Sequence, residues 1–283
     1  MMYDLLLAGV DEPERIARAL AEAFGVSLDA VDMAAEADDD SRNWDAAVSC
    51  EYERRPGPFS LSLDIYVTEA VTAAPEEDAL AVRLARDLAA VILFPAVEKL
   101  PSVWKVSTPR GEVAYARVIE PVSDTDALEV TGVEIPVPEL ASVPVSRFPE
   151  VIKELQLDTP IVDSYLPDGA DDLREVRGLL VNWERLTVRM ARGWPPSSWY
   201  PADMYLDDLR LRDKVVQLAS RIPAERQDPV TRALDDIDAV YRRMTVDDDG
   251  QSLAEVCSLP ADELRTRPWY WLRRPADAPW ATE

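Results

Sequence analysis

The chain of 283 residues contains no histidine. Catalysis by serine–histidine–aspartate or cysteine–histidine sets is therefore excluded, and the commonest general base and a common zinc ligand are missing. The nine glycines lie at least nine residues apart. A phosphate-binding loop needs clustered glycines, so the sequence has neither a dinucleotide fingerprint nor a P-loop. We expect no catalytic residue, no cofactor and no small-molecule ligand.

Cysteines and long apolar runs are also scarce. Cys50 and Cys257 are the only two cysteines, too few for a disulfide framework or a zinc motif. The first ten residues lack the basic region of a signal peptide. The longest uninterrupted apolar run, 88–94, is seven residues and far shorter than a membrane span. The sequence therefore predicts a cytoplasmic protein without membrane contact.

Basic residues are outnumbered, with 30 Lys and Arg against 54 Asp and Glu, which gives a formal charge of −24. This charge repels nucleic acid and anionic lipid, so neither is expected as a partner. It attracts a basic protein and accelerates its association. Acidity also raises solubility, and that simpler explanation stays open.

The first half of the chain shows patterns of both strands and helices. A short buried strand is predicted at 3–8, a helix ends at Gly25, and a further helical turn follows at 27–33. Two alternating segments, 44–52 and 59–67, flank turn residues and predict a β-hairpin. The alternation places Trp44, Cys50 and Phe59 on the inward side of this hairpin.

A second helix is predicted to begin at Pro75 and to end at Pro95, with apolar residues at every fourth position up to Ile92. Strands are predicted at 103–108, 113–119 and 128–133. This order of elements resembles the split βαβ arrangement of ferredoxin-like domains, with an extra strand. We therefore expect an α+β fold whose amino-terminal part is a ferredoxin-like sandwich.

The second half of the chain reads as a mainly α-helical domain with an aromatic tail. A proline-rich linker is predicted at 136–168, which separates a domain at 1–135 from a domain at 169–283. Six of the eight tryptophans lie in the second domain. Apolar spacing there predicts three long helices, and the tail 267–280 is expected to pack on them because exposed aromatic residues promote aggregation.

The corner between the first two long helices of this domain carries Trp194, Trp199 and Tyr200. These aromatic residues form either a contact for a partner or a corner of the core. In the helix that follows, Asp208 lies on the apolar stripe and Arg212 is four residues later. The spacing predicts an Asp208–Arg212 ion pair, which either braces the helix or holds the carboxylate for a ligand.

Acidic runs are the remaining candidate sites. The third long helix is expected to expose Asp235, Asp236 and Asp238, and a turn carries Asp247, Asp248 and Asp249. The turn resembles part of a calcium loop, but Thr245 and Val256 occupy two positions that need carboxylates, so no metal site is predicted. These six aspartates and the aromatic corner are the expected partner-binding residues.

These observations favour a non-catalytic protein that binds another, basic protein. Acidity without catalytic side chains is typical of a bacterial immunity or antitoxin protein, which neutralises a basic toxin by direct binding. Two alternatives stay open: a structural or assembly subunit of a larger complex, and an enzyme that uses carboxylates with a divalent metal.

Overall fold

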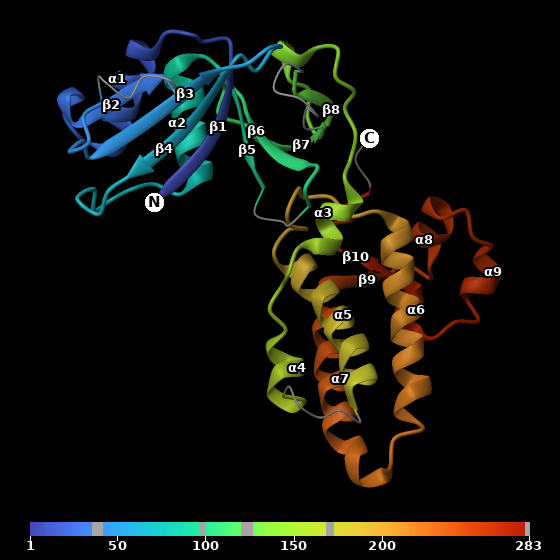
Figure 1. Cartoon of the computed structure of the whole chain (residues 1–283). Helices are drawn as coiled ribbons and strands as arrows, with labels where there is room; N and C mark the ends of the chain where they lie inside the picture. The colour runs from blue at the N-terminus through green and yellow to red at the C-terminus, as the bar shows by residue number, and fades with distance from the viewer. Residues whose placement is uncertain (36–41, 97–99, 120–126, 168–172, 281–283) are drawn as a thin grey trace. The chain divides into compact units, whose positions relative to one another are not determined.

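The computed structural model describes residues 1–35, 42–96, 100–119, 127–167 and 173–280 (Figure 1). The chain forms two compact units, Met1–Glu154 and Leu155–Glu283. The division falls inside the segment 136–168 that the sequence marks as a linker. The first unit combines strands and helices, and most of the second is helical, so the α+β class is confirmed.

Among the described residues of the first unit, eight strands form one sheet in the order β2-β3-β4-β1-β5-β6-β7-β8. Strands β2 and β3 are parallel, and every other neighbouring pair is antiparallel. The elements of this unit are β1 (Met2–Ala8), α1 (Pro13–Phe24), η1 (Leu28–Ala30), β2 (Val31–Ala35), β3 (Val48–Arg54), β4 (Leu61–Val67), α2 (Glu77–Leu88), β5 (Val91–Pro95), β6 (Val103–Ser107), β7 (Val113–Ile119), β8 (Glu129–Val133), η2 (Pro138–Leu140) and α3 (Pro149–Glu154).

Two strands replace predicted helix. The predicted turn at 27–33 is helical only over η1, and the residues from Val31 onward form β2. The predicted helix from Pro75 ends at Leu88, where Ala89 adopts a left-handed conformation with φ of 49°. The following apolar run then forms β5 between β1 and β6. Periodicity alone does not distinguish a short buried strand from a buried helical segment, which explains both errors.

The predicted hairpin is confirmed as β3 and β4, which pair with Cys50 opposite Ile65. Cys50 is fully buried, as expected for a small core residue. Trp44, however, precedes β3 and is 76% exposed, so its predicted inward position is wrong. Phe59 precedes β4 and packs in a second core on the other side of the sheet. Alternation predicted side-chain direction only within the paired residues, because the pleat ends where pairing ends.

Each face of the sheet has a separate core. Helices α1 and α2 cover one face, and their apolar residues pack on side chains such as Leu5, Leu63 and Phe94. The opposite face is covered toward β8 by the segment after that strand, through Val137 and Leu140. The described residues place no such cover over Met2 and Asp4 of β1 or over Asp64 and Tyr66 of β4, which are exposed. That part of the sheet becomes the candidate site below.

The second unit is built on three long helices, of which α5 packs against both α6 and α7. The aromatic tail packs on these helices, as predicted. Its Tyr270 and Trp271 side chains are buried, and the ring centroids of Trp280 and Tyr205 lie 5.1 Å apart. No helix among the described residues is long and apolar enough to cross a bilayer. The elements of the second unit are α4 (Pro160–Tyr165), α5 (Arg174–Ala191), α6 (Ala202–Ala219), α7 (Ala224–Met244), β9 (Thr245–Asp247), α8 (Gln251–Val256), α9 (Ala261–Leu264), η4 (Trp269–Leu272) and β10 (Arg273–Pro275).

Candidate functional site

The expected exposure of Asp238 is wrong, because this side chain is only 4% exposed. Its carboxylate accepts hydrogen bonds from the Arg212 guanidinium at 3.0 and 2.7 Å and from the Trp183 indole N–H at 2.9 Å. Asp238 directly follows Ile237, which is in the core, so the turn of α7 directs it toward α5 and α6 rather than outward. Because its carboxylate accepts three internal hydrogen bonds, Asp238 is part of the core of the second unit.

The predicted Asp208–Arg212 pair is also wrong. Arg212 pairs with Asp238, and Asp208 instead accepts a hydrogen bond of 2.7 Å from the Tyr200 hydroxyl. Burial raises the pKa of Asp208 to about 7, against the opposing effects of the Tyr200 hydrogen bond and the Arg189 charge. The i,i+4 spacing allowed the predicted pair, but the Asp238 carboxylate on α7, distant in sequence, accepts two hydrogen bonds from the guanidinium.

The aromatic corner is part of the core. Trp194 and Tyr200 are each 4% exposed, and their ring centroids lie 5.3 Å apart. The Trp194 indole N–H donates to the Asp277 carbonyl oxygen at 3.0 Å, which ties the corner to the tail. Trp199 is half-buried. Of the two interpretations that the sequence left open, the structure supports the core corner for Trp194 and Tyr200.

The other predicted aspartates lie at or near the surface of the second unit. Asp235 and Asp236 are exposed, and Asp236 accepts a hydrogen bond of 2.8 Å from the Tyr165 hydroxyl. Asp247 and Asp249 are exposed on the turn after α7, and Asp248 is half-buried there. The Asp248 carboxylate accepts the backbone N–H groups of residues 250 and 252, so it also stabilises the turn into α8. A role of these residues in partner binding stays a prediction.

A different acidic surface lies on the uncovered part of the sheet in the first unit. Asp4 on β1 is directly opposite Asp64 on β4, and Asp64 is directly opposite Glu51 on β3. Residues opposite one another in neighbouring strands point to the same face, so three carboxylates form a row across three strands. Asp4 and Asp64 are exposed and Glu51 is half-buried. Like charges directly opposite one another are destabilising, which applies to Asp4 and Asp64, whereas Glu51 is paired with Arg42 at 3.2 Å.

Burial and acidic neighbours both favour the protonated form of Asp64. Its pKa is raised by burial first, then by a hydrogen bond with the Asp4 carboxyl and by the negative charges of Asp4 and Glu51. Arg55 opposes this shift. A cationic group brought to the row would relieve the repulsion between the carboxylates, so the face favours a positively charged partner.

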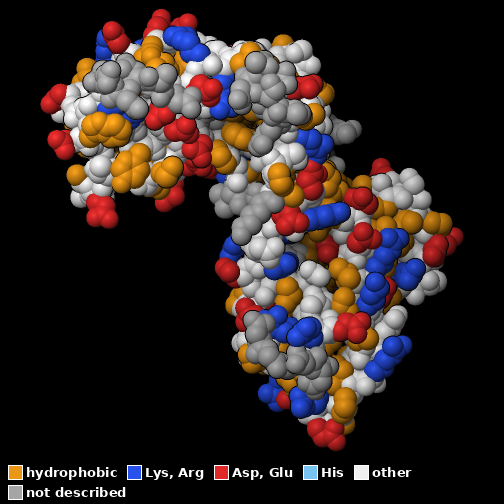
Figure 2. Space-filling view, in the orientation of Figure 1, with side chains coloured by type: hydrophobic (Ala, Val, Ile, Leu, Met, Phe, Trp, Pro, Cys, Tyr) orange, Lys and Arg blue, Asp and Glu red, His pale blue; other side chains and the backbone are white. Residues whose placement is uncertain are grey.

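Large hydrophobic side chains adjoin the carboxylate row. Met2 and Tyr66 are opposite each other on β1 and β4 and are 71% and 52% exposed. Figure 2 shows acidic and hydrophobic side chains next to one another over this part of the first unit. We define the open face as the uncovered surface formed by Met2, Asp4, Trp44, Glu51, Asp64 and Tyr66.

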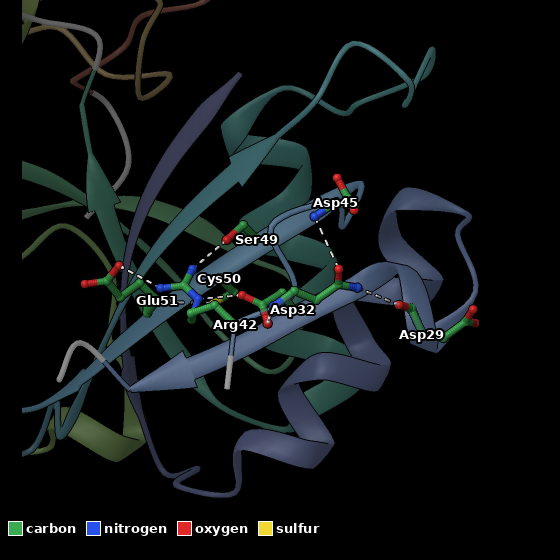
Figure 3. Close-up of polar contacts among 8 residues, drawn as sticks. Asp29, Asp32, Arg42, Asp45, Ser49, Cys50 and Glu51 are labelled. Carbon is green, nitrogen blue, oxygen red and sulfur yellow. Dashed lines mark hydrogen bonds and ion pairs between the residues drawn. The ribbon is translucent and has the colours of Figure 1, made fainter. Parts of the chain in front are cut away.

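A buried arginine, Arg42, lies against outward side chains of β3 (Figure 3). Arg42 donates to the Asp32 carboxylate at 2.6 Å, to Ser49 Oγ at 2.7 Å and to Glu51 at 3.2 Å. The side chain of Arg42 is only 6% exposed, and its guanidinium carbon lies 5.2 Å from the centre of the Trp44 ring. Arg42 therefore holds the exposed indole beside β3 through a cation–π contact.

Sequence reasoning missed the open face, although a signal was present. Asp4 and Asp64 interrupt two strands whose other central residues are apolar. Such isolated charges mark the outward positions of a half-buried strand, but their proximity depends on the pairing of β1 with β4.

Comparison of the chain with protein-family models, curated proteins and solved structures finds no match. Function is therefore inferred from the surface of the molecule itself.

Proposed function

We propose that the protein is a non-catalytic binding protein that captures a basic protein through the open face. The observation that carries this proposal is the row of Asp4, Asp64 and Glu51 beside the exposed side chains of Met2 and Tyr66. An immunity or antitoxin protein that neutralises a basic toxin in the cytoplasm is the class of protein that this surface and the charge of −24 fit best.

The two kinds of side chain on the open face have different roles in such a complex. The carboxylates attract a basic partner and orient it, which raises the association rate more than the final affinity. Trp44, Tyr66 and Met2 supply the apolar contact area that slows dissociation, and aromatic residues are enriched among side chains that dominate binding energy. Exposed apolar groups next to charge are typical of an interaction surface rather than of an inert one.

The proposal is tested by charge reversal of the open face. The full-length wild-type chain is used to isolate a basic protein from its native cell, and that protein is identified, purified and titrated by calorimetry. The variant Asp4→Lys/Asp64→Lys is expected to weaken binding at least about a hundredfold, because two attractive contacts become repulsive. Higher salt is expected to weaken wild-type binding as well.

The matched control is Asp235→Lys/Asp236→Lys, which changes the net charge equally at two exposed positions of the second unit. Its binding is expected to stay within a few-fold of wild type. Equal loss in both variants would show that only the net charge matters and would refute the assignment to the open face. Strong loss in the control alone would move the binding site to α7.

We also infer that β3, β4, β1 and β5 with α1 and α2 are a ferredoxin-like core within the larger sheet. Support comes from their antiparallel order β3-β4-β1-β5 and from the helices on one face. Strand β2 extends this core at one edge, and β6 to β8 extend it at the other. An experimental structure of the chain tests this inference, and a different strand order would exclude it.

A further inference from the structure

The edge strand β8 lies beside a groove that is separate from the open face. Strand β8 is the last in the described sheet and pairs with β7 on one side only. The groove has a volume of about 630 Å³. Its lining includes residues 128–131 on one side and residues 139, 140 and 142–144 on the other. The groove thus lies between the end of the sheet and the segment that covers its second core.

The outer edge of β8 is occupied at one end only. Val133 donates its N–H to the Pro144 carbonyl at 3.1 Å and accepts the Ser146 N–H at 2.8 Å, in a parallel bridge with Val145. Among the described residues, no backbone group outside the sheet bonds to residues 129–131. The described part of the chain therefore pairs with the outer edge of β8 only at Val133, and residues 129–131 beside the groove are left for another strand to pair with.

The side chains of the groove indicate what kind of segment would fit it. Leu128, Val130 and Val143 are half-buried and pack against the second core, so they give the groove an apolar lining. Glu129 and Glu139 are exposed on its two sides. A strand with alternating side chains presents apolar residues to one side and polar residues to the other. Apolar groups would contact the lining, and basic groups would lie near the two glutamates.

We propose that an extended, basic segment of a protein partner binds in this groove and pairs with β8 as an additional strand. Main-chain hydrogen bonds to the open edge supply affinity in this binding mode, and pockets for alternate side chains supply selectivity. The surface is distinct from the open face and rests on its own observations, so this proposal stands or fails separately from the function proposed above.

The experiment uses the full-length protein and a synthetic probe, the capped heptapeptide of alternating lysine and valine that begins and ends with lysine. Amide chemical shifts of the isotope-labelled protein are followed during titration. We expect the largest shifts at 128–133 and 139–146, with a dissociation constant on the order of 1 mM. The same peptide methylated on alternate backbone nitrogens keeps its charge but loses main-chain donors, and it should bind at least about tenfold more weakly.

Two protein variants separate the groove from general charge attraction. Glu129→Lys/Glu139→Lys is expected to weaken binding of the lysine–valine peptide about tenfold, and Glu225→Lys/Glu255→Lys in the second unit should leave it within about twofold. Both pairs are exposed and change the net charge equally. Equal binding of the methylated peptide, equal loss in both variants, or shifts confined to the open face would each overturn the proposal. A concentration-dependent dimer that the peptide dissociates would assign the edge to a second copy instead and would also overturn it.

Discussion

The carboxyl of Asp208 is expected to make the second unit less stable as the pH rises. Its folded-state pKa of about 7 lies above its ordinary value of 3.8, because burial on α6 disfavours the charged form. The folded protein therefore holds a proton between pH 4 and pH 7 that the unfolded chain releases. The stability from this proton is fully present below pH 4 and is lost as the pH rises through about 7.

The size of the effect follows from the two pKa values. The difference between 3.8 and about 7 corresponds to roughly 4 kcal/mol in the free energy of unfolding, at about 1.4 kcal/mol for each pH unit. The side chain of Asp208 keeps part of its surface in contact with solvent, which screens the charge. We therefore expect about half of that amount, roughly 2 kcal/mol.

The substitution Asp208→Asn isolates this contribution, because asparagine stays neutral and still accepts the hydrogen bond of the Tyr200 hydroxyl. Urea unfolding is followed by tryptophan fluorescence, which reports mainly on the second unit because six of the eight tryptophans lie there. The variant should resemble wild type only at or below about pH 4, where the carboxyl is protonated in both states, and it should be about 2 kcal/mol more stable at pH 8.

Asp207→Asn is the matched control, since Asp207 is adjacent on α6 and its side chain is 67% exposed. Its effect should stay within about 0.5 kcal/mol at every pH. A constant difference between wild type and Asp208→Asn across the pH range would refute the raised pKa. A variant that becomes less stable than wild type as the pH rises would show that the ionised carboxylate stabilises the fold.

Two further results are expected. Asp238→Ala should lower the free energy of unfolding of the second unit by about 3–5 kcal/mol, because it leaves the buried guanidinium of Arg212 without its counter-ion. The control Asp235→Ala, at an exposed position, should change it by less than about 0.5 kcal/mol. Urea unfolding measures both. A thiol reagent should modify the half-buried Cys257 first and the fully buried Cys50 only on unfolding, because burial raises the pKa of Cys50 more strongly. Mass spectrometry during labelling identifies the modified cysteine, and reaction of Cys50 first would contradict the prediction.

Local sequence patterns determined much of the helical unit and the hairpin of the sheet. The apolar stripe from Val230 to Tyr241 predicted the buried side of α7, because a helical repeat of 3.6 residues places those positions together whatever they pack against. The missing histidines and scattered glycines likewise limited the available chemistry without any knowledge of the fold. These properties depend on residue type and on spacing along the chain.

Tertiary structure decided which charges are paired and which surface is exposed. Arg212 has Asp208 four residues away, yet it pairs with Asp238, because packing of α6 near α7 brings a better placed carboxylate to its guanidinium. Asp4 and Asp64 are sixty residues apart and become neighbours only through the pairing of β1 with β4. Local spacing carries no information about such contacts, so the acidic open face could be recognised only once the strands were paired.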